Sequence, residues 1–469
     1  MTELPRGEAP GTVPTLPVAV IGAGPIGLSA AVHLLERGET PLILEAGSSI
    51  GASVREWAHV RLFSPWRYVI DPAAAALLEA TGWAAPEPEG LPTGGELLSR
   101  YLEPLAALPR LAAATRLSHR VVSVTRHGMD KVRTAGRETT PFELMVETPT
   151  GPTRLLARAV IDASGTWQNP NPIGAGGVPA RGEIEARTRV HYGIPDIQGV
   201  DRALYAGRRT LVVGSGHSAF NAVLDLVSLA ALEPRTRVLW AIRRRDTRQL
   251  FGGGSKDALA ARGALGSRLR RLVEGGQVRF VTGFQVDRIE AEGTRLAVAA
   301  LDGRRLSGID RIVAATGYRP ELALTRELRL RLDPWLEAPE ALAPLIDPNL
   351  HSCGTVYPHG ALELSHPEPD FYTVGMKSYG RAPTFLLLTG YEQVRSVVCA
   401  LAGDVAGARE VKLTLPETGV CRLDLEEESC CEPALGPAAA AHRGDAGGCR
   451  CSGDPLPAIA APVPAACCA

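Results

Sequence analysis

Along most of the chain, short apolar runs alternate with longer segments whose apolar residues recur at helical spacing. The apolar runs predict strands that are covered on both faces, as in a parallel sheet. These strands are expected within 18–21, 41–45, 159–165, 210–213, 237–242, 309–318 and 370–375. Helices are expected at 28–37, 72–83, 95–108 and 382–401, and paired strands at 120–125 and 142–147. The alternation of buried strands with helices predicts an α/β fold.

The first predicted strand ends in a glycine-rich turn that fits the pattern G-x-G-x-x-G. The turn contains Gly22, Gly24, Pro25 and Gly27. In this pattern the first glycine permits the tight turn, the second lets a pyrophosphate approach, and the third lets helix and strand pack closely. Glu45 ends the next strand, where a carboxylate accepts hydrogen bonds from ribose hydroxyls. The first unit therefore predicts a dinucleotide site for FAD or NAD.

A second strand, turn and helix begin 192 residues later. The turn contains Gly214, Gly216 and Ser218, with Ala219 at the third glycine position, which the pattern tolerates. The next strand ends in Arg243, Arg244 and Arg245. Arginine suits a 2′-phosphate, so this unit predicts an NADPH site. The alternative is that the three arginines are a solvated strand end.

Each unit also contains a later strand that closes on small residues. The first strand closes on Ser164 and Gly165, and the second on Thr316 and Gly317. Small residues let the backbone pass close to a ligand, although a tight turn after a core strand would have the same composition. The repetition indicates two related nucleotide-binding units in one chain.

The composition narrows the functional classes. A chain of 469 residues predicts two or three domains, and a formal net charge of -1 indicates neither nucleic acid nor an anionic membrane as a partner. No apolar stretch is both long and unbroken enough to span a bilayer. Residues 1–15 contain no apolar segment of signal-peptide type, so we expect a disordered leader and a cytoplasmic protein. Cys353, His359 and His366 match no zinc spacing, so no metal site is expected there.

Three features together resemble the two-domain FAD/NAD(P)H flavoproteins. They are the paired glycine motifs, Ala-Thr-Gly-Tyr at 315–318 and Phe-Tyr-x-x-Gly at 371–375. Ser-Gly-Thr-Trp-Gln-Asn-Pro-Asn-Pro at 164–172 is similar to segments of flavin-containing and N-hydroxylating monooxygenases. The resemblance implies two three-layer, Rossmann-like domains. The NADPH-binding domain, 200–320, would be inserted into an FAD-binding domain formed by 16–190 and 321–410.

The resemblance also implies roles for individual residues. FAD would be held by Gly22, Gly24, Pro25, Gly27, Glu45, Val122 through its backbone, Ser164, Gly165, Gly375 and Met376. NADPH would be held by Gly214, Gly216, Ser218, Arg243 and Arg244, with Gly317 also beside a cofactor. Met376 departs from the family, which usually has Asp after this glycine to contact the ribityl chain of the flavin. Residues 205–320 contain no cysteine, which excludes an internal dithiol of the thioredoxin-reductase kind in that domain.

The implied reaction passes a hydride from NADPH to FAD and then electrons to O₂ and a soft nucleophilic small-molecule substrate. The alternative is a flavin reductase that delivers two electrons to another acceptor. No catalytic acid or base is evident in the sequence, and nothing in it indicates an oligomeric state.

The C-terminal segment 417–469 has the composition of a disordered, cysteine-rich tail. Besides Cys421 it holds Cys430, Cys431, Cys449, Cys451, Cys467 and Cys468. Thiolates bind soft ions such as trivalent arsenic and mercury. The pattern is similar to mercuric reductase, which has a C-terminal Cys-Cys, and to flavoproteins of bacterial arsenic resistance. A second functional hypothesis is therefore a thiol-based detoxification protein that binds arsenite or mercury. The alternative is a disordered tail that has no function.

Overall fold

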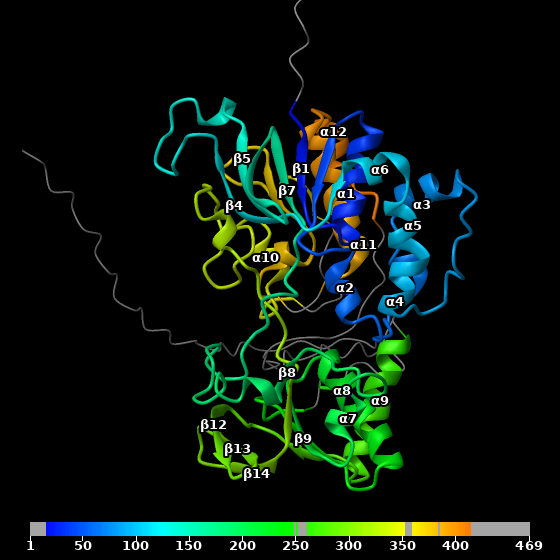
Figure 1. Ribbon diagram of the computed structural model, residues 1–469, viewed down its shortest axis with the longest axis vertical. Helices are drawn as coiled ribbons and strands as arrows, with labels where there is room; N and C mark the ends of the chain where they lie inside the picture. The colour runs from blue at the N-terminus through cyan, green and yellow to red at the C-terminus, as the bar shows by residue number, and fades with distance from the viewer. Residues whose placement is uncertain (1–15, 248–249, 252–259, 352–358, 383–384, 414–469) are drawn as a thin grey trace, which may run out of the picture. The chain divides into compact units, whose positions relative to one another are not determined.

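Two five-stranded parallel sheets carry the glycine motifs, and each is accompanied by a three-stranded antiparallel sheet (Figure 1). The computed structural model describes residues 16–247, 250–251, 260–351, 359–382 and 385–413, all of which belong to one compact unit. The first parallel sheet has the order β16-β7-β1-β2-β3. Its strands are β1 (Val18–Ile21), β2 (Pro41–Leu44), β3 (Thr115–Arg116), β7 (Ala159–Asp162) and β16 (Phe371–Thr373).

The second parallel sheet has the order β11-β10-β9-β15-β8. Its strands are β8 (Val190–Tyr192), β9 (Arg209–Val213), β10 (Arg237–Ala241), β11 (Arg279–Val281) and β15 (Arg311–Ala314). The antiparallel sheets are β4 (Arg120–Arg126), β5 (Phe142–Thr148) and β6 (Gly151–Ala157), and β12 (Val286–Glu292), β13 (Arg295–Ala300) and β14 (Arg305–Ile309).

The helices lie between these strands in the chain, except for α11 and α12, which follow the last strand. The α-helices are α1 (Pro25–Glu36), α2 (Ala52–Glu56), α3 (Pro72–Glu79), α4 (Gly94–Leu97), α5 (Glu103–Ala106), α6 (Pro109–Ala114), α7 (Arg202–Tyr205), α8 (His217–Leu232), α9 (Ala260–Glu274), α10 (Ala343–Ile346), α11 (Leu387–Leu401) and α12 (Val405–Arg409). A π-helical turn, η2 (Leu98–Leu102), joins α4 to α5, and short 3₁₀ turns are η1 (Trp66–Tyr68), η3 (Arg137–Thr139), η4 (Arg187–Arg189), η6 (Ala323–Thr325) and η7 (Gly375–Tyr379).

Each parallel sheet is the middle of three layers, because successive side chains of a strand point to opposite faces. In β1, Val18 and Val20 pack into a core with α1 and α11, whereas Ala19 and Ile21 pack with the β4-β5-β6 sheet. In β9, Val212 packs into the core with α8, whereas Leu211 packs with β12 to β14. The predicted three-layer α/β architecture is therefore confirmed.

The predicted elements differ from the observed ones mainly at their ends and in the antiparallel sheets. The helix expected from residue 28 begins at Pro25, since proline is favoured in the first turn of a helix. The helix expected over 382–401 is described from Leu387, and the one expected over 72–83 ends at Glu79. β6 and the β12-β13-β14 sheet were not predicted, and neither were three short strands of the parallel sheets, β3, β8 and β11.

The predicted domain boundaries stay predictions. The pairing of two strands is relevant to the predicted insertion of one domain into the other. β16 pairs with β7, so the chain returns to the first sheet after leaving the second. β8, at 190–192, already belongs to the second sheet, where it pairs with β15. Within the described ranges, none of the helices combines the length and apolar composition that a bilayer crossing requires.

Candidate functional site

The first glycine loop joins β1 to α1, and each of its glycines has a separate steric reason. Gly22 has a φ of +101°, and a Cβ there would lie 2.9 Å from the carbonyl oxygen of Ala163. At Gly27 a Cβ would collide with the carbonyl oxygen of Gly22. At Gly24 a Cβ would meet no heavy atom within 4 Å. The loop thus holds the start of α1, at Pro25, close to the strand and leaves open space at Gly24, which fits a bound pyrophosphate.

Glu45 follows β2 and is buried, with 8% of its surface exposed. Its Oε2 accepts a hydrogen bond of 2.7 Å from the Ala23 amide, and its Oε1 accepts one of 2.7 Å from the Gly47 amide. Carboxylate oxygens have further lone pairs, so the group can also accept a ribose hydroxyl. The ribose contact stays a prediction, and the structure adds a second role: Glu45 fixes the backbone between Gly22 and Gly24.

A buried ion pair that the sequence reasoning missed lies behind this loop. Lys377 Nζ donates to Asp162 Oδ2 at 2.7 Å and to Ser164 Oγ at 3.0 Å, and the Lys377 and Asp162 side chains are 1% and 0% exposed. Asp162 Oδ1 in turn accepts from the Ser164 hydroxyl at 2.6 Å and the Ser164 amide at 3.1 Å. The signal was an acid inside the otherwise apolar run 159–163 and a lysine just after Gly375.

Gly375 brings the end of β16 to the start of α1. It has a φ of +69°, and a Cβ there would lie 3.1 Å from Ile26 Cγ1 on α1. Its amide donates to Gln393 Oε1 at 2.7 Å, and Met376 follows it, half-buried, in η7. Gly375 and Met376 therefore lie beside the helix that follows the first glycine loop, as a contact with the same cofactor requires.

Two further residues, Gly165 and Val122, are predicted to contact FAD, and within the described chain neither is hydrogen-bonded to the first glycine loop. Gly165 has a φ of +70°, and a Cβ there would meet nothing within 4 Å, so it faces open space after β7. Val122 lies in β4 at an irregularity in its pairing with β5 and is 39% exposed. Its predicted backbone contact with the adenine stays a prediction.

The second glycine loop joins β9 to α8 and repeats the geometry of the first. Gly214 has a φ of +136°, and a Cβ there would collide with the carbonyl oxygen of Ala315, after β15. At Gly216 a Cβ would meet nothing within 4 Å, and Ser218 lies half-buried in the first turn of α8. The His217 ring lies 5.0 Å from that of Phe63, so the segment after α2 reaches this loop.

Arg243 and Arg244 follow β10 at the same sheet edge as the second loop. The Gly214 amide donates to the carbonyl oxygen of Ala241, the last residue of β10, at 3.2 Å. Arg243 is exposed and Arg244 is half-buried, and the Arg244 carbonyl accepts a bond of 2.7 Å from the Gly283 amide. The backbone therefore places two arginines directly after the strand end that adjoins the loop. Their predicted contact with a 2′-phosphate stays a prediction.

Gly317 lies where two chain segments that leave the sheets pair with each other. The Asn171 amide donates to the Gly317 carbonyl at 2.9 Å, and the Thr316 hydroxyl donates to the Asn171 carbonyl at 2.6 Å. Beside them, Trp167 stacks on Tyr318 with 4.8 Å between ring centroids. The hydroxyl of Tyr318 is buried and has no hydrogen-bond partner among the described residues, and burial raises its pKa well above the usual range.

The thiols predicted to bind a metalloid, Cys430, Cys431, Cys449, Cys451, Cys467 and Cys468, lie outside the described residues. Among the described residues, no group of three or more His, Cys, Asp or Glu side chains could hold a metal ion. Cys399 is the one cysteine in this part of the chain; it is buried on α11, with Arg37 Nη2 at 2.9 Å from its sulfur. Cys353 also lies outside the described residues.

Solved structures with this architecture include both reductases and monooxygenases. A bacillithiol disulfide reductase from Bacillus cereus is 18% identical, with a TM-score of 0.58 over 82% of this chain and 99% of that one. A Kutzneria ornithine N-hydroxylase is 17% identical, with a TM-score of 0.54 over 83% and 99%. A flavin-containing monooxygenase from Stenotrophomonas maltophilia is 20% identical, with a TM-score of 0.52 over 83% and 98%. At these identities the likeness concerns the fold alone.

No curated protein sequence matches the chain. The sequence pattern of the pyridine nucleotide-disulphide oxidoreductases matches residues 19–352, which is most of the chain. The chain therefore belongs to this family of FAD-containing enzymes that use NAD(P)H.

Proposed function

We propose that the chain is an FAD-dependent oxidoreductase that takes its electrons from NADPH, with FAD on the first glycine loop and NADPH on the second. The observation that carries this assignment is the difference at the strand end beside each loop. A buried carboxylate, Glu45, lies beside the first loop, and two arginines, Arg243 and Arg244, follow the strand beside the second. A carboxylate suits free ribose hydroxyls, and guanidinium groups suit a 2′-phosphate.

Bound FAD would supply the redox chemistry, since it accepts a hydride and later gives up the electrons. The chain supplies position and charge. The first-turn amides of α1 and α8 would face the two pyrophosphates. Lys377 uses two of its three N–H groups on Asp162 and Ser164, and its third finds no acceptor among the described residues. We propose that this N–H points to an oxygen of the cofactor, one residue after the position at which related enzymes carry Asp.

We further propose a monooxygenase-like reaction, in which O₂ takes the electrons and a soft nucleophilic small molecule receives oxygen. A dithiol reductase needs a pair of cysteines near the cofactor. Residues 205–320 contain no cysteine, and Cys399, the one described cysteine, is buried beside Arg37 rather than beside another thiol. The competing assignment is a reductase that hands the electrons to another acceptor.

The test uses purified full-length protein and the double variant R243Q/R244Q. We expect one FAD per chain, faster oxidation of NADPH than of NADH, and a KM for NADPH that rises about 10- to 100-fold in the variant, because charge-assisted hydrogen bonds are lost. The KM for NADH should stay within about twofold, because NADH lacks the 2′-phosphate. A colourless protein, or equal use of both nucleotides by the unchanged chain, would contradict the assignment. Incorporation of ¹⁸O from O₂ into product separates a monooxygenase from a reductase.

The cysteine-rich tail favours a second candidate, a flavoprotein that binds arsenite or mercury and detoxifies it. Seven cysteines fall within residues 421–468, including two adjacent pairs. Two or three thiolates that are free to meet can coordinate one soft ion. Full-length protein should bind arsenite and change its rate of NADPH oxidation, whereas a chain ending at residue 416 should not. Identical responses of the two proteins would show that the tail has no part in the reaction.

A further inference from the structure

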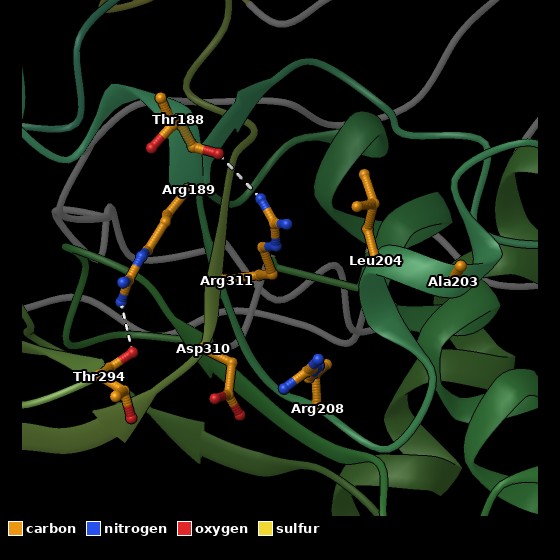
Figure 2. A pocket seen from close by; sticks show the side chains of 8 residues that line it. All are labelled: Thr188, Arg189, Ala203, Leu204, Arg208, Thr294, Asp310 and Arg311. Carbon is orange, nitrogen blue, oxygen red and sulfur yellow. Dashed lines mark hydrogen bonds between the residues drawn. The ribbon is translucent and has the colours of Figure 1, made fainter.

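A cavity of about 400 Å³ lies beside the second parallel sheet, and Figure 2 shows the side chains that line it. It is lined by Thr188, Arg189, Ala203, Leu204, Arg208, Thr294, Asp310 and Arg311. Its three arginines lie at or just before the first residues of β8, β9 and β15, which are parallel neighbours. The cavity therefore lies at the amino edge of the sheet, whereas the second glycine loop leaves the carboxyl edge. Dinucleotides bind at the carboxyl edge, so the cavity is a separate site.

The cavity carries an excess of positive charge. Asp310 is its one acidic residue, and each of its oxygens accepts a hydrogen bond from a residue that does not line the cavity. Asp310 Oδ2 accepts a hydrogen bond of 2.8 Å from the Arg209 amide, and Oδ1 accepts one of 3.2 Å from Arg295 Nε. Arg295 does not line the cavity, so its charge balances that of Asp310 from outside. Three arginines therefore face a single carboxylate in the lining, and the cavity keeps a net positive charge.

Two of these arginines are held in place by backbone carbonyls. Arg189 Nη1 donates to the carbonyl oxygen of Thr294 at 2.7 Å, and Arg311 Nη1 donates to that of Thr188 at 2.8 Å, as the dashed lines in Figure 2 show. A guanidinium has five N–H groups, so most of the donors of both remain available. The Arg208 side chain makes no hydrogen bond or ion pair with any described residue. It is a third donor group that a ligand could engage.

We propose that this cavity binds a phosphate group, either as inorganic phosphate or as a small phosphate monoester. Guanidinium groups match pairs of phosphate oxygens, and a dianion would use the surplus charge of three arginines better than a monocarboxylate. A volume of about 400 Å³ accommodates a small organic group as well as the phosphate. Leu204 and Ala203 supply an apolar wall on one side for such a group. The site is independent of the redox function proposed above.

Isothermal titration calorimetry on the purified full-length protein tests this, with inorganic phosphate and glycerol 3-phosphate as separate probes. The variants are R208Q and R311Q, and the matched control is R237Q. Arg237 begins β10 at the same sheet edge, and its guanidinium donates to the carbonyls of Pro234 and Thr236, but it does not line the cavity. R243Q/R244Q serves as a second control, because it alters the proposed NADPH site.

We expect one saturable site whose affinity falls about 10-fold or more in R208Q and in R311Q, since each change removes charge-assisted hydrogen bonds. Affinity should stay within about twofold in R237Q and in R243Q/R244Q. Tighter binding of glycerol 3-phosphate would identify an organic monoester as the ligand, and equal binding would identify phosphate itself. The proposal fails if neither probe saturates, if R237Q weakens binding as much as R208Q, or if only R243Q/R244Q loses it.

Discussion

The two glycine loops have nearly the same backbone but different surroundings. Gly22 and Gly214 both adopt positive φ, and each lies close to the backbone of a residue just after a neighbouring strand, Ala163 and Ala315. The helices that follow begin at Pro25 and His217, and the spacing of 192 residues between them equals the spacing between the two loops. The shared geometry is therefore what a pyrophosphate requires, and it does not distinguish one nucleotide from another.

What differs is the set of side chains that holds each loop. The first loop is fixed by Glu45 and backed by the buried Asp162–Lys377 pair. The second is backed by an aromatic side chain, since Trp240 Nε1 donates to the Gly214 carbonyl at 2.7 Å. In the proposed assignment, Glu45 would select the nucleotide at the first loop, and Arg243 and Arg244 would select it at the second.

The largest effect is expected at the buried ion pair behind the first loop. Asp162→Asn leaves the Lys377 charge buried without a counter-charge and should lower the free energy of unfolding by about 3–5 kcal/mol. Lys377→Met should cost a similar amount, and the double variant should cost less than the two single changes together. Urea unfolding measures this. If the loss in free energy of unfolding in the double variant equals the sum of the losses in the two single variants, the two residues do not interact as described.

The same variants show whether Lys377 also touches the cofactor. The double variant has no buried charge, so its fold should largely recover. Its affinity for FAD, measured by equilibrium dialysis, should nevertheless stay at least about 10-fold weaker than that of the unchanged chain, because the charge-assisted hydrogen bond is missing. Full recovery of FAD affinity would restrict the pair to a structural role.

The helices after the two loops should respond differently to pH. The His33 side chain on α1 is 12% exposed, and burial alone would lower its pKa, but hydrogen bonds to Asp71 and Glu36 outweigh burial and raise the pKa to about 9. Because the folded-state pKa lies above the unfolded value of about 6.5, this stabilisation is complete below pH 6.5 and is lost as the pH rises through 9. The loss amounts to about 3 kcal/mol. His33→Gln should flatten the stability profile between pH 7 and 10.

Asp225 occupies the equivalent position on α8, and burial raises its pKa to about 6. A raised pKa of an acid means that the folded state disfavours the carboxylate, so stability falls as the pH rises from about 4 through 6. Asp225→Asn should therefore stabilise the protein above pH 6 and leave it unchanged near pH 4. A chain that gains no stability above pH 6 from this change would show that the carboxylate is not buried as described.

Substitutions at the third glycine position of the two motifs, Gly27 and Ala219, should have smaller effects. Gly27→Ala places a Cβ against the carbonyl oxygen of Gly22 and should cost about 1–3 kcal/mol, with loss of FAD from the purified protein. Ala219→Gly, at the equivalent position of α8, should cost only about 1 kcal/mol, from helix propensity, and should leave NADPH binding intact. Thermal unfolding and FAD content measure both. Retention of FAD by Gly27→Ala would contradict the steric argument.

The smallest effect is expected for Glu45→Gln. The amide keeps an acceptor for one backbone N–H but loses the charge and the second acceptor, so FAD affinity should fall about 10-fold. The KM for NADPH should not change, because Glu45 belongs to the first loop. An equal loss of affinity for both nucleotides would mean that Glu45 stabilises the whole fold rather than one site.

The glycines and the charged residues beside the loops could be predicted because their spacing along the chain is fixed by one local unit. Gly22 and Glu45 lie within a single strand–helix–strand segment. The Asp162–Lys377 pair could not be predicted in this way, because 215 residues separate its members and only the pairing of β16 with β7 brings them together. The arginines of the cavity could not be predicted either, because a charged residue before a strand is typical of any solvated strand end.

The assignment of one nucleotide to each loop is tested most directly by placing a carboxylate at each open glycine. Gly24 and Gly216 have φ of -82° and -87°, which any residue adopts, and a Cβ at either meets nothing within 4 Å. A negative charge there should repel a pyrophosphate without unfolding the chain. We predict that Gly24→Asp is purified without FAD, and that Gly216→Asp keeps its FAD but no longer binds NADPH in a calorimetric titration. Loss of FAD from Gly216→Asp, or retention of it by Gly24→Asp, would contradict the account.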